Sequence, residues 1–395
     1  MKKFSFVALT AMTAMASFTS CSSDENIPNI DRSYTDADGL TLTVNGAPML
    51  GKTAKYVSDG NNAVLTLNST FDLSLIPGVE SGSIAGPGVI PGSPETVLKV
   101  PAGSSFSGSS ENTYCTWDYS GEVSETALKL DITNLELKDK SIAGKWTLQP
   151  YNANDDWSSD EYGTVYSEPI YAVWESSAKF DFLGTPMPMS DILRLLMSMP
   201  LINNMTVRVP DALCASLKDV TFGNDGNITA TYADDETEEG TPVYAESPSN
   251  IAQYVLTNKS DMRLFINPAG VIDADAKGRS RAGEGASLPD FNNLLGNVIA
   301  QLAPMMSDGL PMHYNANGNE LTVYLGTETL LPLLKTNVLP LLRDEAFVQM
   351  VVELLSADEE GMGAMIAPML PSMLKSAADV IDGTTKLEIG LNLKK

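Results

Sequence analysis

The chain has 395 residues, 43% of them hydrophobic, which is enough apolar material for two domains with cores of their own. It carries 50 acidic and 25 basic residues, a formal net charge of −25. Because nucleic acids and anionic headgroups repel such a chain, the charge excludes nucleic-acid binding and adsorption to an acidic membrane surface.

Residues 1–20 have the three parts of an export signal. A start with two lysines is followed by an apolar stretch too short to span a bilayer and then by small residues that lead into Cys21. Phe18-Thr19-Ser20-Cys21 resembles the lipobox of bacterial lipoproteins, which implies diacylation of the Cys21 thiol and cleavage just before it. Cys21 is therefore the expected lipidation site, and an ordinary secretory peptide cut near Ser20 is the alternative.

Residues 21–37 are polar and lack apolar periodicity, so they predict a flexible tether between lipid and domain. The run Ser22-Ser23-Asp24-Glu25-Asn26 also resembles the signal that carries lipoproteins of one gut-dwelling Gram-negative phylum across the outer membrane. That resemblance implies an outer-membrane lipoprotein that faces the cell exterior, with the membrane as a partner through the lipid anchor only. A periplasmic face is the alternative.

GAPMLGKT, residues 46–53, satisfies the phosphate-binding pattern G-x-x-x-x-G-K-[ST]. A working loop of this kind opens a long helix, whereas this one lies between the alternating strand Leu40–Val44 and a second expected strand from Lys52 to Val57. Asn45-Gly46 is a hairpin signal. We therefore expect a hairpin without a bound nucleotide, and we expect Lys52 to be exposed to solvent.

Residues 38–140 predict an all-β domain, because strand-like stretches alternate with clusters of Gly, Ser and Pro. The clearest alternation places Leu128, Leu130 and Ile132 on one face of a strand, as in an antiparallel sheet with one wet face. The expected strands are Leu40–Val44, Ala63–Leu67, Thr96–Val100, Thr113–Tyr119, Ala127–Ile132 and Leu135–Lys138. A small antiparallel β-sandwich is favoured over a closed barrel.

Residues 141–395 begin with Gly144-Lys145-Trp146 at the start of a strand. This G-x-W resembles the motif of lipocalins and the wider calycin group, including lipocalin-like domains of bacterial lipoproteins. The resemblance implies a lipocalin-like β-barrel whose closed end is filled by Trp146. In the family this ring packs against an Arg near the last strand, and this chain has Lys386 and Lys394 there instead. The strands that could complete such a barrel are the hairpin at 219–232, then 253–256 with 262–266, 320–325 and 385–393.

Five stretches with helical period predict helices inserted between these strands, at Ser190–Met197, Asp290–Met306, Glu328–Leu342, Asp344–Ser356 and Met362–Ile381. The expected fold class is therefore α+β but β-dominated, with an N-terminal antiparallel β-sandwich and a C-terminal lipocalin-like barrel that carries inserted helices. The whole arrangement resembles uncharacterised two-domain surface lipoproteins of gut commensal bacteria. That resemblance implies a location and an architecture, with no ligand or activity attached.

Few residues of the chain suit catalysis or metal binding. His313 is the one histidine, and Cys115 and Cys214, which we expect to be two buried, unbridged thiols, are the cysteines besides Cys21. Neither a G-x-S-x-G elbow nor the spacing of a zinc or calcium site occurs, so we expect no catalytic residue, no metal and no cofactor. Paired carboxylates for glycoside cleavage stay open, because their separation is spatial.

Two sets of residues are candidate ligand-binding residues. The first set lies on one face of the last expected helix: Met362, Met365, Met369 and Met373. These thioethers suit either an adaptable apolar pocket or irregular core packing. The second set is aromatic: Trp117, Trp157 and Trp174. Exposed rings would stack on sugars, whereas buried rings would fill the cores.

Three functions follow from these observations. The first is a non-enzymatic binding or adhesion-like surface lipoprotein with a glycan or protein partner. The second is a carrier of a small apolar molecule in the C-terminal barrel, and the third is a carboxylate-based glycoside hydrolase. A filled or hollow space above Trp146 discriminates the carrier from the others, and an exposed aromatic platform favours the binding protein.

Overall fold

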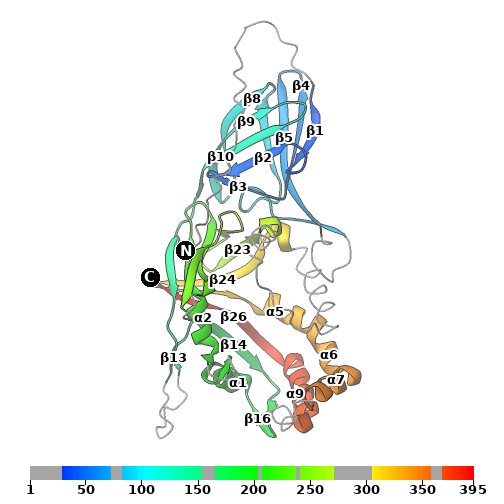
Figure 1. Ribbon diagram of the computed structural model, residues 1–395, viewed down its shortest axis with the longest axis vertical. Helices are drawn as coiled ribbons and strands as arrows, with labels where there is room; N and C mark the ends of the chain where they lie inside the picture. Colours follow the sequence, from blue (N-terminus) through cyan, green and yellow to red (C-terminus); the bar gives the residue numbers. More distant parts are fainter. Residues whose placement is uncertain are drawn as a thin grey trace, which may run out of the picture.

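The computed structural model describes residues 29–72, 82–153, 165–202, 207–236, 241–270, 305–356 and 367–395. A β-sandwich, a β-barrel and a group of helices follow one another along the long axis of the molecule (Figure 1). The expected export signal, the lipidation site Cys21 and the first part of the expected tether lie outside the described residues. Within the described parts, no helix is long and apolar enough to cross a membrane.

Two five-stranded sheets form the sandwich. One sheet consists of β1 (Asp31–Thr35), β4 (Lys52–Asp59), β5 (Asn62–Asp72), β6 (Ser83–Ala85) and β7 (Thr96–Pro101). The other consists of β3 (Ala47–Pro48), β2 (Leu40–Val44), β10 (Leu128–Leu137), β9 (Cys115–Val123) and β8 (Ser105–Glu111). Their inward faces share one hydrophobic core, to which Leu42, Leu65 and Leu130 belong, as the alternating pattern predicts. Only β2 and β10 pair in parallel among the sandwich strands that the structure describes.

The folded chain begins earlier than the sequence predicts. β1 lies inside the range 21–37 that we expected to be a tether, and it pairs with β4 along its whole length. Tyr34 is fully buried, and its hydroxyl donates to the Ser124 carbonyl at 2.6 Å. The prediction of a tether up to residue 37 was therefore wrong for β1, because one buried tyrosine on a polar strand is enough to join it to the core.

The segment that resembles a phosphate-binding loop is a β-hairpin, as expected. Val44 pairs with Ala47 across the two-residue turn Asn45-Gly46, and both turn residues have positive φ, which is the geometry that this dipeptide favours. The expectation for Lys52 was wrong: its side chain is 2% exposed and its Nζ donates to the Pro87 carbonyl at 2.7 Å. Strand alternation puts position 52 on the same inward face as Ala54 and Tyr56.

A closed antiparallel β-barrel of eight strands forms the middle of the molecule. Its strands are β11 (Gly144–Leu148), β19 (Leu217–Phe222), β20 (Asn227–Glu236), β22 (Ala252–Leu256), β23 (Asp261–Ile266), β24 (Leu310–Asn317), β25 (Glu320–Leu325) and β26 (Thr384–Lys394). The pairing of Thr147 with Lys394 closes the ring between β11 and β26. Two further strands extend the sheet, β14 (Ile170–Ser176) on β26 and β21 (Pro242–Glu246) on β20.

The barrel is filled at the end where Trp146 lies. The Trp146 ring is 2% exposed, and its Nε1 donates to the Ile142 carbonyl at 2.8 Å. The Lys395 ammonium lies 4.4 Å from the ring centroid, so the cation over the ring comes from position 395 and not from Lys386 or Lys394 as expected. Leu148 of the same strand and side chains from other strands complete this core: Phe222, Tyr254, Met262, Tyr314, Leu321, Val323 and Leu393.

Helices gather below the barrel in Figure 1. They are α1 (Met189–Ser198), α2 (Val209–Ser216), α5 (Thr327–Leu333), α6 (Leu339–Arg343), α7 (Glu345–Ser356) and α9 (Leu370–Asp382), with a π turn η2 (Leu334–Val338) and a 3₁₀ turn η3 (Ala367–Met369). The helix expected at 328–342 is therefore interrupted between Pro332 and Pro340, since proline supplies no N–H to the helical ladder. Most of the helix expected at Asp290–Met306 lies outside the described residues.

Short hairpins connect these parts. They are β12 (Asn152–Ala153) with β13 (Val165–Ser167), β15 (Phe180–Phe182) with β16 (Thr185–Met187), and β17 (Pro200–Ile202) with β18 (Val207–Arg208).

Sandwich and barrel share a packed junction. Residues of both belong to one hydrophobic cluster, and two buried asparagines cross between them. Asn250 Nδ2 donates to the carbonyls of Ala47 and Pro48, both at 3.1 Å, and Asn267 Nδ2 donates to the Leu50 carbonyl at 3.1 Å. The hairpin that resembles a phosphate-binding loop is thus a part of the sandwich that is hydrogen-bonded to the barrel.

Candidate functional site

Five residues lie in one line across five neighbouring strands, and we call them the cross-strand row. They are Asp261 of β23, His313 of β24, Tyr324 of β25, Gly390 of β26 and Tyr171 of β14, and each is paired in register with the next. Directly paired residues of a sheet share a face, so these side chains project from the same side. The row therefore brings together residues from positions 171 to 390 of the chain.

The row faces away from the barrel core. On β25, Leu321 and Val323 are buried in the core. Tyr324 directly follows Val323, so it points outward by alternation. The Tyr324 ring lies 5.2 Å from the His313 ring and 4.9 Å from the Tyr171 ring, both between centroids. Both tyrosines are only partly buried. The three rings thus form a continuous, curved aromatic surface.

Gly390 makes this surface possible. A Cβ atom at position 390 would lie 2.5 Å from the Tyr324 Cβ and 1.9 Å from the Val323 carbonyl oxygen, closer than real contacts allow. Because β26 has no side chain here, Tyr324 on one side and Tyr171 on the other meet across it.

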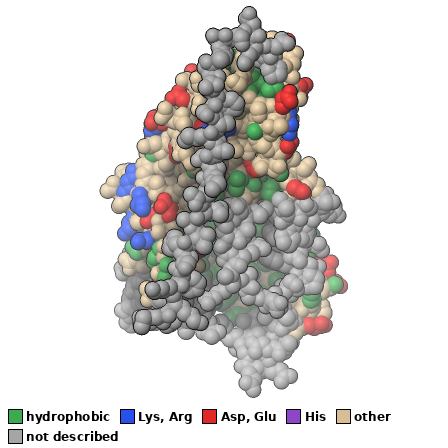
Figure 2. All heavy atoms as spheres, turned by 45° about the horizontal axis from the view of Figure 1, so that its top comes forward, with side chains coloured by type: hydrophobic (Ala, Val, Ile, Leu, Met, Phe, Trp, Pro, Cys, Tyr) green, Lys and Arg blue, Asp and Glu red, His purple; other side chains and the backbone are tan. Residues whose placement is uncertain are grey.

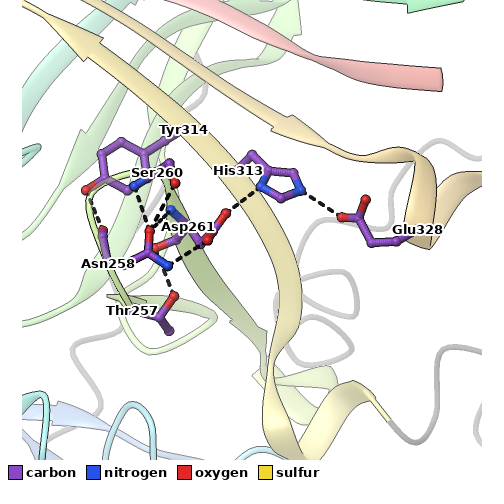
Figure 3. Close-up of polar contacts among 7 residues, drawn as sticks. All are labelled: Thr257, Asn258, Ser260, Asp261, His313, Tyr314 and Glu328. Carbon is purple, nitrogen blue, oxygen red and sulfur yellow. Dashed lines mark hydrogen bonds and ion pairs between the residues drawn. The ribbon is translucent and has the colours of Figure 1, made fainter. Parts of the chain in front are cut away.

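His313 joins two carboxylates, as Figure 3 shows. Its Nδ1 lies 2.6 Å from Asp261 Oδ1, and its Nε2 lies 2.7 Å from Glu328 Oε1 in the first turn of α5. Burial alone lowers the pKa of His313, but the hydrogen bonds with Glu328 and Asp261 outweigh it and raise the pKa above its ordinary value. Both ring nitrogens can donate at once only in the imidazolium, so this geometry favours the charged form.

A tight turn positions Asp261. Asn258 Nδ2 donates to Asp261 Oδ2 at 2.6 Å, and the Tyr314 hydroxyl donates to the Asn258 carbonyl at 2.8 Å (Figure 3). The hydrogen bonds from Asn258 and His313 lower the pKa of Asp261. Because the turn residues hold the carboxylate on its own strand, the imidazole is oriented from the β23 side as well as from α5.

A second charged group lies at the other end of the row. The Tyr171 hydroxyl donates to Glu388 Oε2 at 2.6 Å, and Lys386 Nζ lies 3.2 Å from the same oxygen. The Glu388 side chain is 14% exposed and the Lys386 side chain 42% exposed, so the carboxylate is sheltered and the ammonium is accessible. Burial and the Glu388 carboxylate raise the pKa of Tyr171, which keeps its hydroxyl protonated.

The row therefore combines aromatic faces with carboxylates, a hydroxyl and an ammonium around its edge. Each of the carboxylates of Asp261, Glu328 and Glu388 already accepts a hydrogen bond from a neighbouring side chain. In the part of the chain that the structure describes, no group of three or more His, Cys, Asp or Glu side chains could hold a metal ion. The geometry suits recognition of a ligand with both apolar and hydroxyl-bearing faces.

The two aromatic candidates that the structure describes, Trp117 and Trp174, do not form a platform. Trp117 is 4% exposed and belongs to the sandwich core, so it is not available for stacking. Trp174 of β14 is partly buried and donates from Nε1 to Thr384 Oγ1 at 2.8 Å. Trp157 lies outside the described residues. Tryptophan identity alone did not distinguish these environments.

The methionine candidates do not line one described wall. Met362 and Met365 lie outside the described residues. Met369 is 42% exposed in η3 and Met373 is partly buried in α9. The helix assumed for the stripe begins only at Leu370, so the helical spacing used to align the four side chains does not hold over the described part.

Gly144, Trp146 and the cysteines have structural surroundings. Gly144 has φ +130°, a conformation that L side chains rarely adopt, and its neighbour Trp146 enters the barrel core. Both thiols are free, as expected; Cys115 is buried as expected, whereas Cys214 is only partly buried. Burial raises the pKa of Cys115 to about 12, so its thiol is unreactive at neutral pH.

The sequence prediction missed the cross-strand row. Its members come from separate stretches, and their alignment depends on strand register, which a single sequence leaves open. One signal was present: Tyr324 occupies an outward position beside Leu321 and Val323, and an aromatic side chain on the wet face of a strand is a candidate for binding. Comparisons of the chain with protein-family models, with curated proteins and with solved structures return no match, so its function is inferred from the geometry of this site.

Proposed function

We propose that this protein is a non-enzymatic lipoprotein, anchored through Cys21 in the outer membrane with its domains outside the cell, that binds a glycan at the cross-strand row. The observation that supports glycan binding is the unbroken line of His313, Tyr324 and Tyr171 rings edged by carboxylates and Lys386. Sugar rings present apolar C–H faces that stack on aromatic rings, and their hydroxyls bond to charged groups at the edge.

The charge of the protein favours a neutral glycan over an anionic polymer as the ligand. Acidic side chains are spread over the visible described surface and do not gather in one patch (Figure 2). With a formal net charge of −25, the chain repels polyanions at long range, whereas an uncharged sugar meets no such barrier.

Binding fits the site better than hydrolysis. A glycosidase needs one carboxylic acid to protonate the leaving group and a second carboxylate to act as base or nucleophile. Here Asp261 and Glu328 are both held by the same imidazole, and Glu388 is held by Tyr171 and Lys386. The hydrogen bonds that lower the pKa of Asp261 make it a poor proton donor, and the carboxylates of Glu328 and Glu388 are already engaged by side chains of the protein.

The test is a measurement of affinity for a panel of purified neutral polysaccharides by affinity electrophoresis. Tyr171→Ala and Tyr324→Ala each remove one ring of the row, and we expect each to weaken binding about five- to tenfold, as for loss of one stacking contact. Tyr171→Phe keeps the ring but loses the bond to Glu388, so it should retain most of the affinity.

Tyr244→Ala is the matched control, because Tyr244 is a 37% exposed tyrosine on β21, outside the row. Circular dichroism establishes that each variant is folded. Unchanged binding in both row variants, or an equal loss in Tyr244→Ala, would refute the proposal. Release of reducing sugar ends by the wild-type protein would replace binding with hydrolysis.

A further inference from the structure

A cavity of about 320 Å³ lies between β14 and α1, apart from the cross-strand row. Trp174 lines it, whereas Tyr171 three positions earlier belongs to the row, and side chains three apart in a strand point to opposite faces. The volume is at the lower end of the range for small-molecule sites, so the cavity suits a compact ligand.

One stripe of α1 forms a wall of this cavity. Ser190, Leu193, Arg194 and Met197 line it and follow the spacing i, i+3, i+4 and i+7, so they lie on the same helical face. The core stripe of the same helix is different, since Met189 and Ile192 are buried against Val380 of α9. α1 is thus anchored on one face and leaves another face open to the cavity.

The opposite wall is apolar and held in place. Trp174 packs against residues of two helical clusters, and its bond to Thr384 Oγ1 fixes the indole plane. Ala172, two positions before Trp174 on β14, continues this wall on the same face. Together with Leu193 and Met197 these two residues offer a surface that fits a branched or aromatic side chain.

Three charged side chains line the cavity: Glu168, Glu175 and Arg194. Glu168 is partly buried there, and the described residues supply no hydrogen-bond partner for its carboxylate. Burial raises the pKa of Glu168, and the Arg194 guanidinium opposes that rise. Arg194 is itself exposed, and in the described part of the chain its ion pair is with Asp191, at 3.9 Å.

We propose that this cavity binds a free α-amino acid with an apolar side chain. The ligand's ammonium group faces Glu168, its carboxylate faces Arg194, and its side chain lies between Trp174 and the Leu193–Met197 stripe. A zwitterion matches Glu168 and Arg194, whereas a purely apolar ligand would leave the Glu168 carboxylate without a partner. This site is independent of glycan binding at the row.

Isothermal titration with L-phenylalanine and L-leucine tests the proposal on the full chain. Glu168→Gln and Arg194→Gln should each weaken L-phenylalanine binding by at least about tenfold, because each removes one charge-assisted contact. Two analogues probe the charges from the ligand side: N-acetyl-L-phenylalanine lacks the ammonium, and phenethylamine lacks the carboxylate. Both should bind at least about tenfold more weakly than L-phenylalanine to the wild-type protein.

Each charge-removing variant should have no further effect on the analogue that lacks the charged group which that residue would bind. Glu168→Gln should not further weaken N-acetyl-L-phenylalanine, and Arg194→Gln should not further weaken phenethylamine. Glu353→Gln on α7 and Arg343→Gln on α6 are matched controls at exposed positions outside the cavity and should bind L-phenylalanine as the wild type does. Absence of binding by either amino acid at 10 mM, or equal affinity for phenethylamine and L-phenylalanine, would overturn the proposal.

Discussion

The amino group of Lys52 lies inside the sandwich core. Its ammonium donates to the Pro87 carbonyl, and burial lowers its pKa from 10.5 to about 7, with the Asp36 charge opposing the change. Between these two pH values the unfolded chain keeps a proton on Lys52 that the folded chain releases. The unfolding free energy therefore rises with pH over the window from about 7 to 10.5.

Lys52→Met should remove this dependence. Relative to the variant, the wild-type protein should gain up to about 1.4 kcal/mol of unfolding free energy per pH unit between pH 7 and pH 9. Urea unfolding at pH 7, 8 and 9 measures it. Lys55→Met is the matched control, because Lys55 lies on the exposed face of the same strand with 53% of its side chain accessible. Parallel pH profiles of wild type and Lys52→Met would contradict the assigned burial.

Lys52 and Trp146 show what residue type predicts and what it does not. Trp146 was expected in the barrel core from the resemblance of Gly144-Lys145-Trp146 to the lipocalin motif, and the structure buries it. Lys52 has the same inward orientation, but its charge predicted exposure. The Pro87 carbonyl that accepts the hydrogen bond from Lys52 is 35 residues away in the chain. The sequence alone does not show that these two groups are close.

At the scale of elements, α5 is tied to the barrel sheet by Thr327, which exchanges hydrogen bonds with the Leu387 backbone of β26, and by the imidazole of His313. His313 of β24 bonds to Glu328 in the first turn of α5 and to Asp261 of β23, and the Tyr324 ring lies beside it. The pKa of His313 is raised in the folded protein, so this tie contributes fully below the ordinary pKa of 6.5 and is lost as the pH rises through the folded value.

Hydrogen exchange of the α5 amides tests this tie. After correction for intrinsic exchange rates, protection should fall between pH 6 and pH 8.5 by a free energy of about 0.5 to 1 kcal/mol, a range that allows for solvent screening of the partly exposed pair. His313→Gln and Glu328→Gln should both abolish the difference. Glu345→Gln, an exposed acid at the start of α7, should leave it unchanged. Equal pH dependence in His313→Gln would show that another group controls α5.

The elements were more predictable than their arrangement. β2 and β25 have the predicted bounds, Leu40–Val44 and Glu320–Leu325, because alternation and turn residues act locally. β8 was missed, since its run of serines carries little apolar signal. The parallel pairing of β2 with β10 and the register that aligns the cross-strand row depend on contacts between distant segments, and these contacts are not encoded in any local pattern.

At the scale of the whole molecule, sandwich and barrel behave as one packed body at the 45–51 hairpin. Met49 is 1% exposed, and Asn267 Nδ2 lies 3.7 Å from its sulfur. Gly51 approaches so closely that a Cβ atom there would lie 2.5 Å from the Ala269 side chain. The hairpin is therefore an attachment point at which backbone carbonyls accept hydrogen bonds from the barrel.

Asn250 is the central contact of that junction, and its loss should weaken the whole molecule. Its φ is +64°, so Asn250→Gly keeps the backbone favourable while it removes the bonds to the Ala47 and Pro48 carbonyls. Because the substitution removes two hydrogen bonds to part-buried carbonyls, we expect a loss of about 1 to 3 kcal/mol. Asn134→Gly is the control: φ is +50° there too, but Asn134 is exposed and its amide bonds only to Asp118, so the loss should stay within about 1 kcal/mol. Guanidinium unfolding gives both free energies, and protease cleavage within residues 45–51 under native conditions should increase in Asn250→Gly alone. Equal losses in the two variants, with no new cleavage at the hairpin, would show that the junction is held by its apolar contacts and not by this asparagine.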